Sequence, residues 1–374
     1  MKAYQTNLKL VAIACAIALL THGAFGQFRK YSNEFLNIGA GARALGMGGA
    51  SVTSVKGPEA GYWNPSALTT VTTNPSFSAM HAEYFGGIGK YDYGSVAFPV
   101  KDHKRTLAFT LLRFAIDDIP NTLFLVDADG TPNYNNIESF SSADYAGLFS
   151  LGQVLKESEE DGYKLSVGGT VKIIHRNVGS FAKAWGFGLD ASANFIKDNW
   201  RLGAVLRDAT STFNTWSFDF SEREKEVLYL TRNEIPVNST EMTAPRLMLG
   251  GSYDFIFGEK ATLTAEAMLE TTFDGKRNTL IKTSFMSIDP RLGLEFNLKQ
   301  AFFLRAGVGN FQQALKDGDT TNTQKVWIYQ PSLGAGFKIK NVGIDYAFSN
   351  LANQSSPLYT HVVSLFVDLR KNEE

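Results

Sequence analysis

The sequence predicts an all-β fold: a closed antiparallel transmembrane β-barrel of about 14 strands with an N-terminal plug segment. Three observations predict it. Apolar residues alternate with polar or small residues in segment after segment from about Ser76 onward. Most segments are about 9 to 14 residues long, which exceeds a typical soluble strand and suits a tilted strand that crosses a bilayer. Tight turns and long loops alternate between them.

The first 26 residues have the features of a secretory signal peptide. Lys2 and Lys9 give a basic start, Leu10 to Leu20 form an apolar stretch, and Ala24-Phe25-Gly26 precedes Gln27. The apolar stretch is shorter than the roughly 20 residues that a membrane-spanning helix needs. We therefore expect export and removal of this segment, and we divide the chain into a signal peptide (1–26), a plug or periplasmic segment (27–74) and an outer-membrane barrel (75–374).

Composition narrows the class of protein. The only cysteine, Cys15, lies in the expected signal peptide, so the mature chain has no thiol and no disulfide. Of the 36 basic residues only Lys2 and Lys9 would be removed, which leaves 34 basic and 37 acidic residues and a formal charge of −3. This balance gives no reason to expect nucleic acid as a partner.

The predicted strands follow from the alternation. In Tyr163 to Ile173, for example, tyrosine, leucine, valine and isoleucine occupy one face, and lysine, serine, glycine and threonine the other. The predicted segments are 75–84, 91–101, 105–117, 144–155, 163–176, 184–197, 199–211, 245–257, 261–271, 291–299, 301–311, 327–340, 342–350 and 360–370.

The connections give the orientation. Tight turns fall at one set of ends, and the long loops 118–143, 212–243, 272–290, 312–326 and 351–359 fall at the other. Outer-membrane barrels place short turns on the periplasmic side and long loops outside. A secreted soluble sandwich or propeller would also alternate, but it has no reason to keep its long loops on one side. Closure into a barrel pairs every backbone group that lipid would otherwise leave unpaired.

Charged side chains on the polar faces of these strands must avoid lipid, so we expect them inside the barrel. They are Lys164, Lys172, Asp190, Arg201, Arg207, Asp254, Glu266, Glu295, Arg305, Lys338 and Asp345. Their mixed signs predict a lumen filled by its own ion pairs and argue against a strongly selective ion pore.

The segment before the barrel has a glycine-rich pattern of its own. It contains Gly39, Gly41, Ala42, Arg43, Gly46, Met47, Gly48, Gly49 and Ala50, followed by Tyr62, Trp63, Asn64, Pro65 and Leu68. This stretch resembles the N-terminal region of the PorV/PorQ family of the type IX secretion system in Bacteroidetes, and more distantly the plug region of the FadL fatty-acid channels. Ser66 and Ala67 stand where the PorV/PorQ family more often has Ala-Gly.

The glycines also have a direct physical meaning, because they allow backbone to pack closely against backbone, and Asn-Pro favours a tight turn or a helix start. We take Gly39, Gly41, Arg43, Gly46, Met47, Gly48, Gly49, Trp63, Asn64 and Pro65 as the plug motif. Two arrangements fit the motif equally: a plug deep in the lumen, or a cover over the periplasmic mouth.

Motifs for enzymatic or cofactor chemistry fail in their spacing. Gly39 and Gly41 with Gly46 do not make G-x-G-x-x-G, Gly86 to Lys90 lacks the first glycine and the final Ser or Thr of a P-loop, and no G-x-S-x-G occurs. The histidines are isolated, which disfavours zinc. We expect no enzyme activity and no cofactor. Asp117, Asp118, Asp127 and Asp129 with Gly130 leave open a calcium site in the first long loop, although an ordinary solvated loop is favoured.

The long loop 212–243 is unusually rich in aromatic residues. Phe213, Trp216, Phe218, Phe220 and Tyr229 are candidates for contact with a partner, because aromatic residues concentrate at binding surfaces. The alternative is that they fold over the barrel rim or lie at the lipid interface. Ser221 and Glu224 have capping-box spacing for a short helix.

The resemblance to PorV/PorQ implies a non-enzymatic outer-membrane barrel of type IX secretion. Such a protein would bind or shuttle the C-terminal signal domains of secreted cargo between the translocon and the surface attachment machinery, so its partners would be those subunits, the cargo and the lipid bilayer. The alternative function is a FadL-like channel for hydrophobic small molecules, in which the plug gates a lumen pocket.

Overall fold

A computed structural model describes residues 30–100, 104–127, 129–315, 325–349 and 359–369. The expected signal peptide lies outside these residues. Within them, no helix is both long and apolar enough to cross a membrane.

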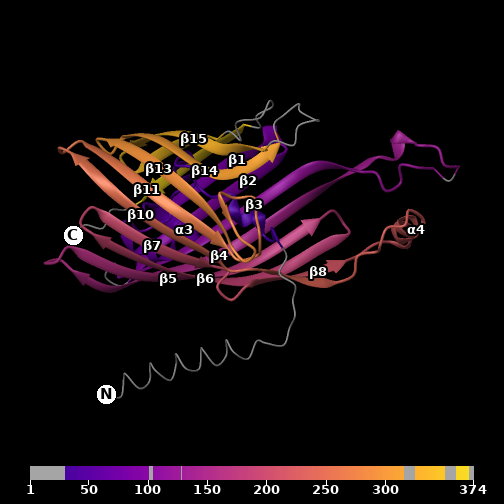
Figure 1. The fold of residues 1–374 in the computed structure, drawn as a ribbon, viewed down its shortest axis with the longest axis horizontal. Helices are drawn as coiled ribbons and strands as arrows, with labels where there is room; N and C mark the ends of the chain where they lie inside the picture. The colour runs from indigo at the N-terminus through magenta and orange to yellow at the C-terminus, as the bar shows by residue number, and fades with distance from the viewer. Residues whose placement is uncertain (1–29, 101–103, 128, 316–324, 350–358, 370–374) are drawn as a thin grey trace, which may run out of the picture.

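The described chain forms one closed antiparallel sheet (Figure 1). Its strands are β1 (Ser76–Tyr84), β2 (Gly89–Val100), β3 (Arg105–Asn121), β4 (Glu138–Ser158), β5 (Tyr163–Val178), β6 (Ala182–Lys197), β7 (Trp200–Arg207), β8 (Thr212–Phe218), β9 (Ser239–Thr243), β10 (Arg246–Phe257), β11 (Ala261–Thr272), β12 (Ile281–Lys282), β13 (Ser287–Leu298), β14 (Phe302–Leu315), β15 (Lys325–Ile339), β16 (Val342–Ser349) and β17 (Thr360–Asp368). Most strands pair with the next strand along the chain, but β7 pairs with β10, β8 with β6 and β9, and β11 with β13. β1 pairs with β17 to close the barrel.

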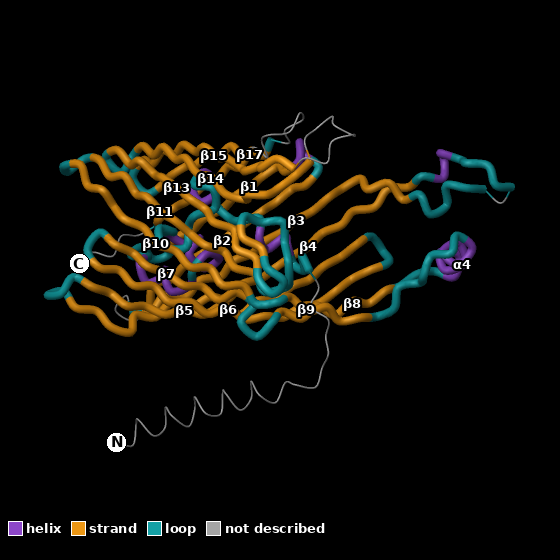
Figure 2. Tube along the Cα trace, in the orientation of Figure 1, coloured by secondary structure: helices purple, strands orange, loops and turns teal. Residues whose placement is uncertain are grey.

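Short helices complete the described structure. They are η1 (Glu34–Asn37), α2 (Ala42–Gly46), η2 (Gly57–Glu59), α3 (Ala60–Trp63), η3 (Pro65–Thr70), η4 (Phe85–Gly87), η5 (Tyr134–Asn136) and α4 (Glu222–Leu230). The helices that precede β1 lie inside the ring of strands, whereas α4 lies beyond the barrel (Figure 2).

The predicted 14-strand closed barrel is confirmed. Among the described strands, β7 and β8 together form one interrupted strand of the barrel, and β9 and β10 together form another. β12 is a two-residue strand that pairs with β13. The two interruptions, at 208–211 and at Ala244-Pro245, lie side by side. On one side of them β7 pairs with β10 as far as Arg207 and Arg246. On the other side β8 pairs with β9, beginning at Thr212 and Thr243. Pro245 has no N–H to donate to a ladder, which accounts for a break there.

The prediction that 212–243 is entirely loop was wrong. The sheet resumes at Thr212, and β8 pairs with both β6 and β9. Its residues do alternate: Thr212 and Asn214 are buried, whereas Phe213 is exposed. The interruption before Thr212 hid this continuation. The predicted capping box is present, with Ser221 and Glu224 starting α4.

Alternation of burial runs along the strands, as in β1, where every second residue from Ser76 to Ala82 is buried. The inward positions carry the polar residues. Of the charges expected inside, those that are buried are Lys172, Asp190, Arg207, Glu266, Glu295, Arg305 and Asp345. The outward positions carry exposed leucine, isoleucine, valine and aromatic side chains, as lipid contact requires.

Candidate functional site: the plugged lumen

The N-terminal segment fills the lumen over most of its depth. At its start, the Ser32 hydroxyl donates to Glu241 at 2.9 Å and the Asn33 amide donates to Thr243 at 2.8 Å, both on β9 near the long-loop end. At its end, the Thr73 hydroxyl donates to Asp368 at 2.9 Å, beside the short-turn end of β17. The segment is therefore a plug inside the lumen and more than a cover over the periplasmic mouth.

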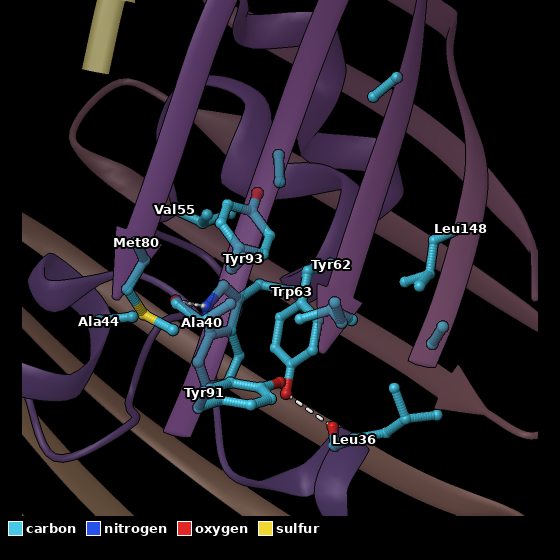
Figure 3. Close-up of a cluster of buried hydrophobic side chains, with 14 of the residues drawn as sticks. Leu36, Ala40, Ala44, Val55, Tyr62, Trp63, Met80, Tyr91, Tyr93 and Leu148 are labelled. Atoms are coloured by element: carbon cyan, nitrogen blue, oxygen red, sulfur yellow. Dashed lines mark hydrogen bonds between the residues drawn. The ribbon is translucent and has the colours of Figure 1, made fainter. Parts of the chain in front are cut away.

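One side of the plug packs through apolar residues against β1 to β5, β16 and β17. Tyr62 and Trp63 form its centre, with ring centroids 5.2 Å apart and nearly perpendicular (Figure 3). Their polar atoms are satisfied within the plug: the Tyr62 hydroxyl donates to the Leu36 carbonyl at 2.6 Å, and Trp63 Nε1 donates to the Ala40 carbonyl at 2.7 Å. The two rings thus tie distant parts of the plug together while they bury against the wall.

The motif glycines lie where backbone meets backbone. Gly48 has φ +68°, and a Cβ built there would lie 2.6 Å from the Val308 nitrogen on β14. The wall also contributes glycines to this contact, Gly293 and Gly334. A Cβ at Gly293 would lie 2.6 Å from the Met47 carbonyl oxygen, and a Cβ at plug residue Gly46 would lie 3.1 Å from Gly334. Any side chain at these contacts would push the plug away from the wall.

Asn64 and Pro65 start η3. Asn64 is fully buried; its side-chain oxygen accepts from the Ser66 N–H at 3.2 Å and its amide donates to the Val52 carbonyl at 2.8 Å. Pro65 occupies the first position of the helix, where no N–H is needed. A Cβ at Gly152 on β4 would lie 2.7 Å from the Pro65 carbonyl oxygen, so this turn also lies directly against the wall.

Two wall carboxylates hold the other side of the plug. Glu266 accepts from the backbone N–H groups of Thr53 at 2.8 Å and Ser54 at 3.0 Å. Glu295 lies 2.8 Å from Arg43 and 3.2 Å from Lys56, both in the plug. Paired groups of this kind satisfy buried charges that would otherwise be costly.

The same ion pairs continue into the wall. Arg305 on β14 lies 2.7 Å from Glu295 and 2.7 Å from Asp345 on β16. Arg43, the charged residue of the sequence motif, therefore joins a buried chain of alternating charges that spans three strands and the plug. The sequence indicated that the lumen holds mixed charges, but not which residues pair.

The plug carboxylate Glu59 lacks such a partner at ion-pair distance in the described structure. It accepts from the Ser78 hydroxyl at 3.2 Å and lies directly beside Gly41, where any side chain would overlap the carboxylate. Burial raises the pKa of Glu59 to about 7, with a further contribution from the negative charge of Asp345. Glu59 therefore changes charge near neutral pH at the plug–wall contact.

A cavity of about 370 Å³ lies between the plug and the long-loop ends of β10 to β17. Apolar side chains of Ile38, Leu45 and Tyr84 contribute to its lining. The charged residues in the lining are Glu34, Arg246, Glu270, Arg277, Asp289 and Arg291.

The charged side chains of the cavity are paired with one another. Plug residue Glu34 lies 2.9 Å from Arg277 and 3.4 Å from Arg246, and Arg291 lies 3.0 Å from Glu270. The cavity is thus bounded by the plug and lined by mutually neutralised charges, by uncharged polar side chains such as Asn278, Gln312 and Ser332, and by fewer apolar groups. This lining suits a neutral occupant better than an ion.

The aromatic residues of segment 212–243 separate into three groups. Trp216, Phe218 and Phe220 stack in sequence, with centroids 6.2 and 6.3 Å apart. Phe213 faces outward and is exposed, and Tyr229 is exposed on α4, away from the stack. Only the first group forms a common surface.

The stack extends onto other strands. Phe181, directly before β6, stacks on Phe220 at 5.7 Å, and Phe140 of β4 packs against Phe181 at 5.2 Å. Arg176 lies over the Trp216 ring at 5.0 Å and over plug residue Phe35 at 5.9 Å. We call Phe140, Phe181, Trp216, Phe218 and Phe220 the aromatic patch. It lies on the segments of β4, β6 and β8 near the long-loop end and reaches the plug at Trp216.

The remaining candidate site, a calcium site in the first long loop, is not assembled. Asp117 pairs with Lys90 at 2.9 Å, and Asp127 accepts from the amides of Asn133 and Asn136. Across the described residues, no group of three or more histidine, cysteine, aspartate or glutamate side chains is placed to hold a metal ion.

No protein-family model matches the chain, and no curated protein is similar to it in sequence. Solved structures share its fold. The toluene transporter TbuX of Ralstonia pickettii aligns with a TM-score of 0.55 and 13% identity, over 89% of this chain and 99% of that one. The CymD monoaromatic hydrocarbon channel gives 0.57 and 13% over 90% and 99%, and the toluene transporter TodX of Pseudomonas putida gives 0.52 and 13% over 88% and 98%.

Identity this low shows a common fold and no more. It supports the distant likeness to hydrophobic-molecule channels at that level, while the PorV/PorQ resemblance stays a prediction. The chain forms a closed β-barrel with the fold of these transporters, and its own N-terminal segment plugs the lumen.

Proposed function

We propose that the protein is a gated outer-membrane channel for small, largely apolar molecules. The observation that carries this proposal is the cavity between the plug and the long-loop ends of the strands, lined by paired charges, uncharged polar side chains and apolar side chains, with no unpaired charge among the described residues to select an ion. The fold shared with hydrocarbon transporters supports it.

The aromatic patch offers an entry surface for such molecules. Stacked rings bind apolar and aromatic solutes through their faces and edges without needing hydrogen bonds. The patch ends where Arg176 lies between Trp216 and Phe35 of the plug. A solute held there would be next to the segment that must move for it to pass.

Passage requires movement of the plug, because the plug contacts the wall through glycines, ion pairs and buried rings. A disulfide can test this, since the mature chain is expected to contain no cysteine. The Thr69 hydroxyl of the plug lies 2.9 Å from the Ser166 hydroxyl of β5, so cysteines at both positions would lock plug to wall. Thr215 and Thr240, directly opposite on β8 and β9 with hydroxyls 3.3 Å apart, give a wall-to-wall disulfide as control.

We expect oxidised Thr69→Cys/Ser166→Cys cells to lose uptake of a radiolabelled monoaromatic hydrocarbon and to regain it with reductant. The Thr215→Cys/Thr240→Cys control should take up the solute at the parent rate in both states. Uptake by the locked protein at the parent rate would refute a gate formed by this plug. In the unlocked protein, Trp216→Ser should slow uptake, while Tyr229→Ser on α4 should leave it unchanged.

A second candidate is the accessory role in type IX secretion that the PorV/PorQ resemblance implies. The observation that favours it is the tall extracellular extension of β3, β4 and the α4 segment beyond the barrel, which offers surface for large partners (Figure 1). This role does not require the plug to open. Purification of a tagged chromosomal copy in mild detergent should then recover translocon or attachment subunits, or cargo with a C-terminal signal domain, and the locked variant should still secrete cargo.

A further inference from the structure

The outer wall of the barrel carries a row of polar and aromatic side chains across six neighbouring strands. The row consists of His81, Asp92, Arg113, Tyr145, His175 and Trp185, each directly opposite the next in the strand register. We call it the outer row. All six point away from the lumen, in line with the exposed apolar residues of the same strands.

Contacts along the outer row are continuous. Asp92 accepts from His81 Nδ1 at 2.7 Å, with the tautomer assigned accordingly, and from Arg113 Nη1 at 3.0 Å. Tyr145 stacks on His175 with centroids 6.5 Å apart, and His175 packs on Trp185 at 4.4 Å. His175 Nδ1 is buried without a hydrogen-bond partner. Arg113 carries five N–H groups; Asp92 takes one of them, and Tyr145 also forms a side-chain hydrogen bond with Arg113.

The row lies close to the outer edge of the bilayer. Eight residues of β3, Arg105 to Leu112, lie between the short-turn end and Arg113. A strand tilted as in outer-membrane barrels rises about 2.5 Å per residue, so Arg113 lies about 20 Å up an apolar band that is about 25 Å tall. On the opposite wall, the outward residues of β13 stay apolar from Leu298 to Ile288.

Directly beneath the row is an apolar groove of about 620 Å³ on the same outer wall. Its floor is made of Gly94 and Gly147, and its sides of Leu111, Phe149 and Ile173, which are 55%, 52% and 43% exposed. Asp92, Arg113, Tyr145, His175 and Trp185 of the outer row close its upper end. The groove thus combines a channel wide enough for hydrocarbon with a polar end at headgroup level.

We infer that this groove binds one phosphorylated glycolipid of the outer leaflet, with an acyl chain over Gly94 and Gly147 and the phosphorylated sugar on the outer row. Arg113 supplies the donor for phosphate. Asp92 and Tyr145 supply the acceptor and the hydroxyl that sugar hydroxyls need, and Trp185 supplies a face for a sugar ring. A phospholipid without the sugar would use only part of this set.

The glycine floor allows a direct test. A Cβ at Gly94 meets no atom within 4 Å, and one at Gly147 meets only Leu111, at 3.9 Å, so larger residues fit the fold and fill the groove. Gly251 is the matched control. It lies in a second outer groove, between β7 and β14, which has Trp200 and Tyr253 but lacks outward charged groups among its described lining residues.

The protein would be purified in mild detergent, titrated with lipid A, and examined by native mass spectrometry, with heat-modifiable gel mobility as the check of folding. We expect one lipid A per barrel for the parent protein and for Gly251→Leu. Gly147→Leu should lose this bound lipid. Arg113→Gln should bind about tenfold more weakly, the effect of losing one charge-assisted hydrogen bond.

Three results would overturn the assignment: no lipid A retained by the parent protein, equal retention by folded Gly147→Leu, or equal displacement of lipid A by phosphatidylglycerol. The third would show that the groove accepts any anionic lipid and that the outer row does not recognise the sugar. Loss in Gly251→Leu to the same degree as in Gly147→Leu would likewise count against a site at this groove.

Discussion

The inner and outer faces of the barrel wall use the same residue types for opposite purposes. Inside, Gly293 leaves space for the plug backbone, and Glu295 is buried among three cations. Outside, Gly147 leaves open space facing lipid, and Asp92 is 42% exposed beside Arg113. The consequence of changing a glycine or a carboxylate therefore depends on the face it occupies, which strand periodicity reveals and residue identity does not.

The largest difference between the faces is expected for the carboxylates. Glu295→Ala leaves Arg43, Lys56 and Arg305 without their shared partner in a buried site, which should lower the free energy of unfolding by about 3–5 kcal/mol. Asp92→Ala outside should cost about 1 kcal/mol or less, because the Arg113 charge it leaves unpaired lies near the edge of the apolar band, where a charge facing lipid costs little. Urea unfolding of the barrel in lipid vesicles measures both, and similar losses for the two variants would contradict the contrast.

The second expected effect concerns pH and the plug face. Because the pKa of Glu59 is raised to about 7 from an ordinary 4.5, the folded protein keeps a proton that the unfolded chain releases between these values. Stability should therefore fall as pH rises from about 4.5 to 7, by on the order of 3 kcal/mol in total. Glu59→Gln should remove this slope. Unfolding midpoints at pH 5 and pH 8 test it; parallel pH curves for the variant and the parent protein would rule out the assignment.

The third effect compares the glycines. Gly293→Ala places a Cβ 2.6 Å from the Met47 carbonyl oxygen and should cost about 1–3 kcal/mol as the plug shifts. Gly147→Ala should change stability by less than about 0.5 kcal/mol. Limited proteolysis of folded protein in detergent distinguishes them, since a displaced plug exposes new cleavage sites before β1. Equal protection of the plug in both variants would argue against the close packing described at Met47.

The smallest effect lies away from both faces. The Ser221 hydroxyl caps α4 by accepting from the Glu224 N–H, and the Glu224 carboxylate accepts from the Ser221 N–H at 2.7 Å. Ser221→Ala should destabilise this helix by about 1 kcal/mol and leave barrel unfolding unchanged, because α4 has no buried residues. Amide hydrogen exchange should be faster in 222–230 alone; a change in the barrel strands would mean that α4 packs on them.

The strands could be predicted because a two-sided wall imposes a period of two on every segment. The prediction stopped where the wall is interrupted: Asp208 to Ser211 and Pro245 hid β8 and β9, although Thr212 and Asn214 alternate with Phe213. That short alternation was the signal that could have extended the strand. A local pattern of alternation indicates whether a residue faces the lumen or the outside. It does not indicate which strand the chain pairs with after an interruption.

The site was harder to predict than the wall. The glycine motif indicated close backbone packing, but the matching wall glycines, such as Gly293 and Gly334, are far away in sequence and look like ordinary small residues of a strand. The aromatic patch joins residues of 212–220 to Phe140 and Phe181, a contact set by strand order. Pairing across a barrel depends on register, which composition and spacing do not determine.

The position of the plug also bears on how the protein is assembled. Plug residues contact β17 directly: the Ala42 N–H donates to the Ser364 hydroxyl at 2.7 Å and the Thr73 hydroxyl donates to Asp368. β17 is the strand that closes the ring against β1. The strand pair that closes the barrel therefore lies around the N-terminal plug, and the plug contacts the last described strand. We therefore expect the plug to be in place when β17 closes the barrel against β1.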